Sequence, residues 1–240
     1  MNLCVWGFVR SLAISVLAVP AAAQTSDTIS VADPLAPLPA EPSLGEPDEG
    51  LDSEPSSSVQ QVTTWVLESG DSGGLPFIVV DKSRAQVFLF DAFGQFMGGT
   101  AALIGITEGD DSVPGVGDRE LAKIPLEERT TPAGRFVAKL GPAYGQKVVL
   151  WIDYTTALSL HPVVPGSRDE KRLERLESAT PDDNRITFGC INVPRDFFRN
   201  AVLPLFKTSF GIVYILPETK TLAEAFNMPP QNASPMRANR

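Results

Sequence analysis

The 240-residue chain contains little that could bind a metal ion. It has one histidine, His161, and two cysteines, Cys4 and Cys190. A zinc site normally takes three or four protein ligands, so these counts exclude the usual His/Cys zinc centre. Basic residues are also few, 20 against 29 acidic ones, which gives a formal net charge of −9. This balance argues against a nucleic-acid binder, which would carry a basic patch. We expect no metal and no nucleic-acid partner.

The apolar segment at the N-terminus is too short to span a bilayer. It covers the eight residues Leu12–Val19, whereas a spanning helix needs about 20. Arg10 precedes it, Pro20 ends it, and three alanines then fit a cleavage site. The pattern predicts a signal peptide over residues 1–23, removed after Ala23. An uncleaved anchor is the alternative.

Cleavage at this place changes the cysteine content of the protein. The mature chain of 217 residues, periplasmic or secreted, loses Arg10 and Cys4, and its charge becomes −10. Cys190 is then its single thiol, in a compartment that favours disulfides. Such a thiol is buried and inert, paired between chains, or kept for chemistry.

The composition divides the mature chain into a spacer and a domain. Residues 24–62 contain six prolines, eight acidic residues and no Lys or Arg, which predicts a disordered acidic linker. It either holds the domain away from a wall polymer or is a tail without function. From Thr63 onward there are 19 basic and 21 acidic residues. We expect a folded domain over 63–217 and a C-terminal helix and tail over 218–240.

The domain has more strand signals than helix signals. Short β-branched and aromatic runs bounded by Gly, Pro and Asp predict strands; they are 76–81, 84–90, 96–107 (one bent strand or two), 134–140, 147–153, 157–161 and 210–216. Helices are predicted over 168–178, 194–205 and 219–226. We expect a mainly β (α+β) domain with β-sandwich-like mixed sheets and a few short helices.

The segment around Cys190 carries the strongest chemical signal. In Arg185–Pro194 an apolar strand leads to Gly189 and Cys190, and a helix is expected after it. Glycine permits a tight turn whose N–H groups could stabilise an oxyanion. A thiol there needs a base, and His161, 29 residues upstream, is the only imidazole. A small core residue and a surface histidine are the ordinary alternatives.

Several motifs follow one another in a characteristic order between about residues 76 and 216. They are Ile78-Val-Val-Asp-Lys-Ser83 with Gln86-Val-Phe-Leu-Phe90 and Gly94, then Thr131-Pro-Ala-Gly-Arg-Phe136, His161, and Thr187-Phe-Gly-Cys-Ile-Asn192. This set resembles the L,D-transpeptidase catalytic domain, the YkuD family.

The resemblance implies an acyl transfer on peptidoglycan stem peptides, without metal or organic cofactor. The cysteine would attack the carbonyl between an L-centre residue, usually diaminopimelate, and the terminal D-Ala. D-Ala leaves and a thioester remains. An amine of a second stem, or a lipoprotein side chain, would take the acyl group, in cell-wall cross-linking, organisation and shape. Carried over residue by residue, Cys190 is the nucleophile and His161 its base. The N–H of Cys190, with Gly189 shaping the turn, is the oxyanion site, and Thr187 hydrogen-bonds within it.

The chain departs from the family pattern at the corner itself. Phe188 stands where many members have His, and Asn192 stands where many have an Arg that helps with the substrate's carboxylate. Asn192 and Arg185 are therefore candidate substrate-binding residues, with Arg195 as a further possibility.

The surroundings of His161 also differ. Pro162 follows it in place of a small residue, and Ser159 is a candidate for orienting the imidazole. The long gap before Cys190 contains the charged stretch 168–175, which is either a helical flap over the cleft or a solvated helix. The loop-rich insertion 109–129 could line the groove.

The residues leave three functions open. The first is the L,D-transpeptidase. The second is an L,D-carboxypeptidase or endopeptidase, in which water accepts the same acyl group. The third is a wall-binding protein with a dead site, which the substitutions at Phe188 and Asn192 would favour.

Overall fold

The computed structural model describes residues 55–143 and 145–228. The predicted signal peptide, nearly all of the predicted spacer, and the end of the tail lie outside the described residues. Within the described residues, no helix has the length and apolar character needed to cross a membrane.

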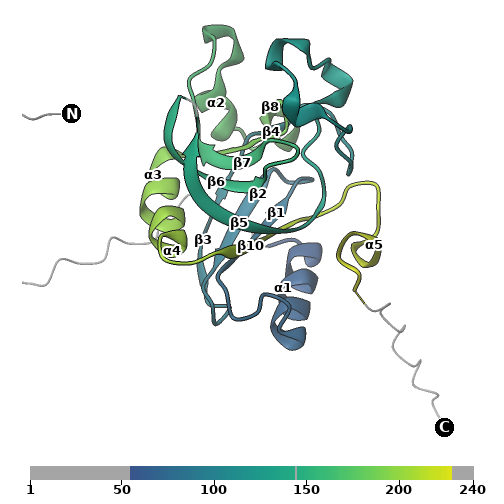
Figure 1. Cartoon of the computed structure of the whole chain (residues 1–240), viewed down its shortest axis with the longest axis vertical. Coiled ribbons are helices and arrows are strands. Elements are labelled where there is room, and N and C mark those ends of the chain that lie inside the picture. The colour runs from purple at the N-terminus through teal and green to yellow at the C-terminus, as the bar shows by residue number, and fades with distance from the viewer. Residues whose placement is uncertain (1–54, 144, 229–240) are drawn as a thin grey trace, which may run out of the picture. The chain divides into compact units, whose positions relative to one another are not determined.

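The domain is built on one mixed sheet of eight strands, in the order β3-β2-β1-β10-β5-β6-β7-β9 (Figure 1). β1 with β10 and β7 with β9 are parallel pairs, and the other neighbours are antiparallel. The strands are β1 Phe77–Asp81, β2 Gln86–Phe90, β3 Phe96–Ala101, β5 Gly134–Ala143, β6 Gln146–Asp153, β7 Leu158–Pro162, β9 Ile191–Val193 and β10 Gly211–Ile215. β4 Ile104–Gly105 and β8 Arg185–Thr187 form a second, small sheet. The predicted mainly β class with mixed sheets is confirmed.

The two edges of the large sheet meet each other. Leu103, two residues beyond the end of β3, exchanges two backbone hydrogen bonds of 2.8 Å with Asn192 of β9. The sheet therefore curls until it nearly closes. This closure places β9, which follows Cys190, between β7 and the chain after β3.

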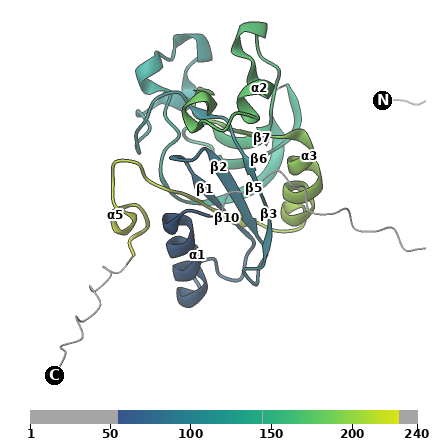
Figure 2. The same ribbon diagram turned by 180° about the vertical axis from the view of Figure 1, so that it is seen from behind.

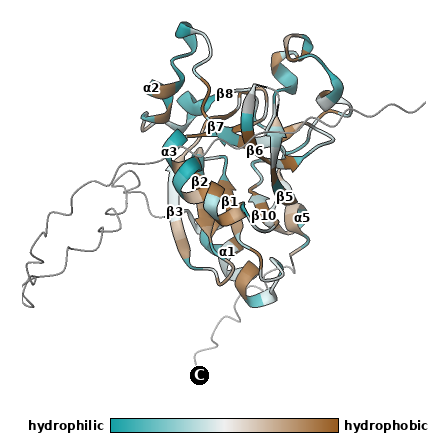
Figure 3. Ribbon diagram, turned by 60° about the vertical axis from the view of Figure 1, so that its left-hand side comes forward, coloured by the Kyte–Doolittle hydropathy of each residue, from teal (hydrophilic) through white to brown (hydrophobic). Residues whose placement is uncertain are grey.

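Both faces of the central strands are buried, which explains their continuous apolar runs. On β1, Ile78 and Val80 belong to the cluster that also takes in Phe198 and the neighbouring helix. Phe77 and Val79 belong to the cluster on the other face, under the first and last helices. In Figure 3 the central strands are coloured hydrophobic and the tips of the upper loops hydrophilic.

The domain begins earlier than the sequence predicted. α1 spans Ser57–Ser69, so residues 57–62, assigned to the disordered spacer, are its first half. The Ser56 hydroxyl caps the helix by accepting a hydrogen bond from Val59 N at 3.2 Å. Val59 and Val62 are fully buried against β1 and β10. The sequence analysis missed this apolar stripe because the residues that precede it are strongly acidic.

The other helices are short. The predicted helix 168–178 is a 3-10 turn followed by α2, Arg172–Leu176. The prediction for 194–205 is confirmed as one helical run, in which α3 Arg195–Phe197, a π-helical stretch Phe198–Val202 and α4 Leu203–Phe206 follow one another. α5, Leu222–Phe226, begins with a capping box at Thr221. Figure 2 shows α1 and α5 on the same side of the sheet, where both contact one core cluster.

Two insertions rise from the same end of the domain, beside β4 and β8 in Figure 1 and at the top of Figure 2. The first follows β4 and contains three 3-10 turns, Val116–Asp118, Leu121–Lys123 and Leu126–Glu128. The second follows β7 and contains α2 and the 3-10 turn Pro181–Asn184. The first corresponds to the loop-rich insertion 109–129 noted in the sequence. The second contains the charged stretch 168–175.

Candidate active site

The parallel pairing of β7 with β9 brings the two predicted catalytic residues to one place. Its register sets Leu160 opposite Ile191 and His161 opposite Asn192. Side chains alternate along a strand, so Ser159 and His161 share one face of β7. Cys190 lies one position before Ile191 and therefore opposite Ser159. The sequence separation of 29 residues is bridged by this single strand pair.

The Cys190 thiol is held by the neighbouring strand. Its Sγ lies 3.6 Å from Ser159 Oγ and 3.5 Å from the carbonyl oxygen of Ala157. Burial raises the pKa of Cys190, and hydrogen bonds from the side chain and backbone of Ser159 offset part of that rise. The resting thiol is therefore protonated at neutral pH, and attack on a carbonyl requires a base.

The turn before Cys190 has the geometry expected of an oxyanion site. Gly189 has φ +128°, and a Cβ there would lie 2.8 Å from Thr130 O, so only glycine fits. Thr187 Oγ1 donates to Cys190 O at 2.7 Å and accepts from Gly189 N at 3.1 Å. Thr131 Oγ1 donates to Gly189 O at 2.7 Å. The two carbonyls and the Gly189 N–H are thus occupied by threonine hydroxyls.

His161 is oriented by groups that the sequence did not identify. Its Nδ1–H donates to the Pro162 carbonyl oxygen at 2.9 Å, and Asn192 Nδ2 lies 3.1 Å from its Nε2. Ser159, the candidate named from the sequence, contacts the thiol. Burial lowers the pKa of His161; the Pro162 carbonyl opposes this, and the positive charge of Arg172 lowers it further. The imidazole is neutral at neutral pH and can accept a proton.

The second insertion reaches into the site through Arg172. Its Nη1 donates to Asn192 Oδ1 at 3.1 Å, and its Nε lies 2.6 Å from Glu170 Oε2. A Cβ on Gly166 would meet this ion pair at 2.0 Å, so the loop backbone packs directly on it. The charged stretch in the gap before Cys190 therefore contacts the site and is not a solvated helix alone.

Arg185 does not lie where the sequence interpretation needed it. On β8 it forms an ion pair with Glu218, whose other oxygen is 3.4 Å from Lys82 Nζ. Lys82 Nζ also donates to Asp110 Oδ1 at 2.9 Å. Burial alone would raise the pKa of the Asp110 carboxyl, but its hydrogen bonds, first among them that of Thr219, hold it well below its usual range. The Arg185 guanidinium is thus part of this buried network, and its role in binding a substrate stays a prediction.

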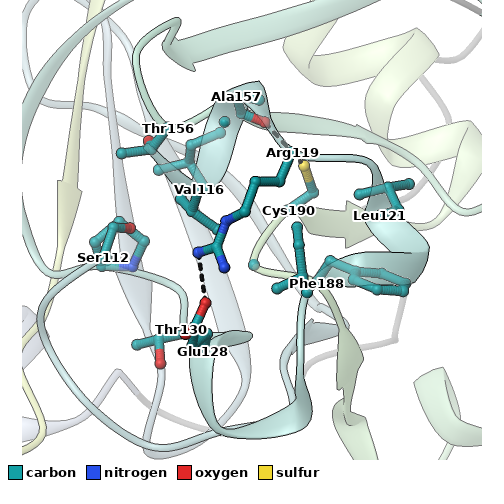
Figure 4. Close-up of a pocket in the computed structure, with 15 residues that line it drawn as sticks. Ser112, Val116, Arg119, Leu121, Glu128, Thr130, Thr156, Ala157, Phe188 and Cys190 are labelled. Carbon is teal, nitrogen blue, oxygen red and sulfur yellow. Dashed lines mark hydrogen bonds and ion pairs between the residues drawn. The ribbon is translucent and has the colours of Figure 1, made fainter. Parts of the chain in front are cut away.

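The thiol opens onto a pocket between the sheet and the first insertion (Figure 4). The pocket has about 480 Å³ of space, including the part open to solvent. Phe188 and Gly189 line the pocket beside Cys190. The Arg129 guanidinium lies over the Phe188 ring, 3.9 Å from the ring centroid, in a cation–π contact. The residue that replaces the family's histidine is thus part of the pocket wall.

Sequence reasoning missed three charged residues at the site. Arg119 and Glu128 form an ion pair in the pocket, and Arg172 contacts Asn192. All three belong to the insertions, where nothing in the sequence distinguishes them from surface charges. Among the described residues, no group of three or more His, Cys, Asp or Glu side chains is placed to hold a metal ion.

Comparison with known proteins finds similarity in structure alone. No family model and no curated protein matches the chain. The catalytic domain of an L,D-transpeptidase from E. faecium matches with 16% identity and a TM-score of 0.34, over 59% of this chain and 96% of that domain. The L,D-transpeptidase LdtMt1, solved with imipenem, matches with 12% identity and a TM-score of 0.34, over 59% of this chain.

The helical cell shape determining protein Pgp2 from Campylobacter jejuni also matches, with 15% identity and a TM-score of 0.39 over 70% of this chain. The match spans 58% of the length of each of these last two proteins. Likeness at this level concerns the fold and says nothing of activity.

Proposed function

We propose that this protein is an exported L,D-transpeptidase that cross-links or remodels peptidoglycan in the periplasm or outside the cell. The observation that carries the proposal is the convergence, through the β7–β9 pair, of a lone thiol and the only imidazole of the chain. Cys190 also lies at the wall of a pocket and directly after the tight turn at Gly189. The motif resemblance supplies the substrate class, stem peptides ending in D-Ala.

The reaction starts when Cys190 Sγ attacks the carbonyl that precedes the terminal D-Ala. The S–H proton moves to His161, the S–C bond forms, and the C–N bond breaks after the proton is handed to the departing nitrogen. The products are free D-Ala and a thioester. An amine of a second stem, or of a lipoprotein side chain, then attacks the thioester and regenerates the thiol.

The protonation states fit this sequence of steps. Burial keeps both the thiol and the imidazole neutral before attack. In the resting structure His161 Nε2 accepts a hydrogen bond from Asn192, so the imidazole must exchange this bond for one from the thiol when the proton moves. The Pro162 carbonyl then stabilises the imidazolium through Nδ1–H.

Acyl transfer also needs a hydrogen-bond donor for the oxyanion of the tetrahedral intermediate. We place this donor in the turn before Cys190. Thr131 and Thr187 hold the carbonyls of Gly189 and Cys190 away from the reacting centre. We assign the N–H of Cys190 as the donor to the oxyanion. Loss of one such donor typically lowers kcat by about 100- to 1000-fold.

Product analysis tests the proposal directly. The mature protein, residues 24–240, is incubated with a disaccharide-tetrapeptide, and the products are read by mass spectrometry, with Cys190→Ala as the matched control. A cross-linked dimer that has lost one D-Ala, absent with the control, is the expected result. Tripeptide monomers alone would instead assign an L,D-carboxypeptidase. No change, together with no carbapenem adduct on Cys190, would overturn the acyl-enzyme mechanism and leave a wall-binding role.

A further inference from the structure

We propose that an aromatic pair on the same face of the sheet as the Cys190 thiol binds the sugar chain to which the stem peptide is attached. The pair is Trp151 and Tyr154, whose rings stack with their centroids 4.8 Å apart and their planes 25° from parallel. The ligand class is a β-linked chain of N-acetylated hexosamines. The inference rests on the proposed function and extends it from the peptide to the glycan.

The sheet register places Trp151 in line with the thiol. Trp151 of β6 is paired with Ser159 of β7, and Ser159 lies opposite Cys190, one position before β9. Side chains of residues directly opposite each other lie on one face of a sheet, so Trp151 and the thiol share a face, with Ser159 between them. From Cys190 to Trp151 there are two strand spacings, about 10 Å.

This separation suits the length of a stem peptide. The proposed point of attack follows the third residue of a tetrapeptide stem, and three residues in an extended conformation span about 10 Å. A stem whose reacting carbonyl lies at Cys190, and which runs across β7 toward β6, therefore brings its sugar end to Trp151 and Tyr154.

The Tyr154 ring presents one free face. Its other face stacks on Trp151, yet Tyr154 is 68% exposed, so the outer face of the ring is open to solvent. The face of an aromatic ring is electron-rich, and a β-linked hexosamine carries a set of axial C–H bonds on each side of its ring. These surfaces complement each other, which favours a sugar ring as the ligand.

The pair is held in place by its own strand and turn. Trp151 Nε1 donates to Pro142 O at 3.1 Å. Asp153 Oδ1 accepts from Thr155 N at 3.0 Å and so fixes the turn that contains Tyr154. A platform that is already ordered lowers the entropic cost of binding.

The turn that carries Tyr154 also reaches the thiol. It ends at Ala157, whose carbonyl oxygen lies 3.5 Å from Cys190 Sγ. Thr156 and Ala157 line the pocket beside the thiol, as Figure 4 shows. The aromatic pair and the candidate active site therefore share one structural element.

The same face continues beyond Trp151 to another exposed ring. Lys139 of β5 is paired with Trp151, and its Nζ lies 4.9 Å from the centroid of the Phe210 ring. Phe210 directly precedes β10 and is 49% exposed. Aromatic and hydrogen-bonding side chains thus follow one another from β6 to β10, which suits a polymer of several sugars.

Binding of a glycan without peptide tests the site without relying on turnover. The mature Cys190→Ala protein, labelled with ¹⁵N, is titrated with a peptide-free tetrasaccharide of alternating N-acetylglucosamine and N-acetylmuramic acid. Its only tryptophans are Trp65 and Trp151, so it gives two indole N–H signals. The Trp151 signal, identified by its absence in Trp151→Phe, should shift while that of Trp65 stays. An unmoved Trp151 signal at the highest soluble concentration of tetrasaccharide would overturn the inference.

Variants of the exposed ring supply the second arm, each combined with Cys190→Ala. Tyr154→Ala should weaken binding of the tetrasaccharide by about two- to ten-fold, the equivalent of one aromatic contact, and Tyr154→Phe should restore it. Phe93→Ala is the matched control, because Phe93 is a 91% exposed aromatic residue on the turn between β2 and β3. An affinity unchanged in Tyr154→Ala, or reduced equally in Phe93→Ala, contradicts the proposal.

Kinetics of the wild-type protein separate the inference from the proposed function. D-Ala release should show a higher kcat/KM with the disaccharide-tetrapeptide than with the free tetrapeptide, and Tyr154→Ala should narrow that ratio. Equal kcat/KM values in the wild type would overturn the glycan site and leave the transpeptidase intact. Tetrasaccharide binding that Tyr154→Ala weakens, with no D-Ala release from either substrate, would support the glycan site and refute the transpeptidase. Dimerisation that Tyr154→Ala abolishes, without a tetrasaccharide shift, would assign the rings to a second copy of the chain and overturn the inference.

Discussion

The Nδ2 of Asn192 lies 3.1 Å from the Nε2 of His161, so the imidazole that serves as the proposed base is held by an amide in the resting structure. Asn192 is itself buried, and its Oδ1 accepts a hydrogen bond from Arg172. Asn192 stands where the family pattern has an arginine. Here it contacts the Arg172 guanidinium from the second insertion on one side and the His161 imidazole on the other. The charge of Arg172 also lowers the pKa of His161, after the larger effect of burial.

Removing the Arg172 charge should shift the pH dependence of the reaction. The cation lowers the pKa of His161, so Arg172→Gln raises that pKa toward its ordinary value. The neutral imidazole is the active form and is lost as the pH falls through its pKa. The acidic limb of kcat/KM for D-Ala release should therefore move to higher pH in the variant.

The control for this measurement is Arg168→Gln, which removes an exposed arginine from the same insertion. Its acidic limb should coincide with that of the wild type. An unchanged limb in Arg172→Gln would mean that the guanidinium does not influence the base, and a limb displaced equally in both variants would point to a general charge effect.

Local chemistry was predictable from the sequence, and long-range partners were not. The strand runs, the corner at Gly189 and the Cys190–His161 pair all depend on residues close in sequence or on a motif. Arg172 and Asn192 come into contact only when the second insertion folds. The sequence showed the length and the charge of this insertion, but not its contacts. Pro162 was noted only as a departure from the family pattern, yet its carbonyl accepts the hydrogen bond from the imidazole.

The internal partner of Arg185 could not be predicted for a related physical reason. A charged residue five positions before Cys190 is an obvious candidate for binding a carboxylate, and proximity in sequence supported it. The structure satisfies that charge internally with Glu218, from a segment beyond β10. The sequence interpretation relied on the short separation between Arg185 and Cys190. Tertiary packing instead determines the partner of Arg185, which is Glu218.

Ser159 should control the reactivity of the thiol. Its hydroxyl and N–H lower the pKa of Cys190 against the effect of burial, so Ser159→Ala raises that pKa. Alkylation of Cys190 by iodoacetamide at pH 7.5 should slow by about two- to ten-fold, the equivalent of one hydrogen bond. Ser112→Ala, which alters the same pocket from the insertion, serves as the control and should alkylate at the wild-type rate. Equal rates in all three proteins would exclude a role for this hydrogen bond.

The buried ion network should be a major source of stability. The Lys82 side chain is 1% exposed and contacts Asp110 and Glu218, so Lys82→Met leaves the buried Asp110 carboxylate without its cation, while Glu218 keeps its ion pair with Arg185. We expect a loss of about 3–5 kcal/mol in the free energy of unfolding, measured by urea denaturation. Lys220→Met removes a cation from the exposed pair with Asp111 and should leave the urea midpoint unchanged. A small effect of both substitutions would show that the network is replaceable by apolar packing.

The position of α1 leads to a prediction about where the folded domain starts. A chain beginning at Pro55 keeps the Ser56 cap and the whole helix, whereas one beginning at Thr63 loses Val59 and Val62 from the second core cluster. Burial of each valine contributes about 1.5–3 kcal/mol, and the missing cap exposes the helix start further. The shorter chain should therefore unfold with a free energy lower by about 3 kcal/mol or more, and its Trp65 fluorescence should shift to the red. If both chains unfold at the same urea concentration, the first half of α1 adds nothing to the domain and the spacer extends to residue 62 after all.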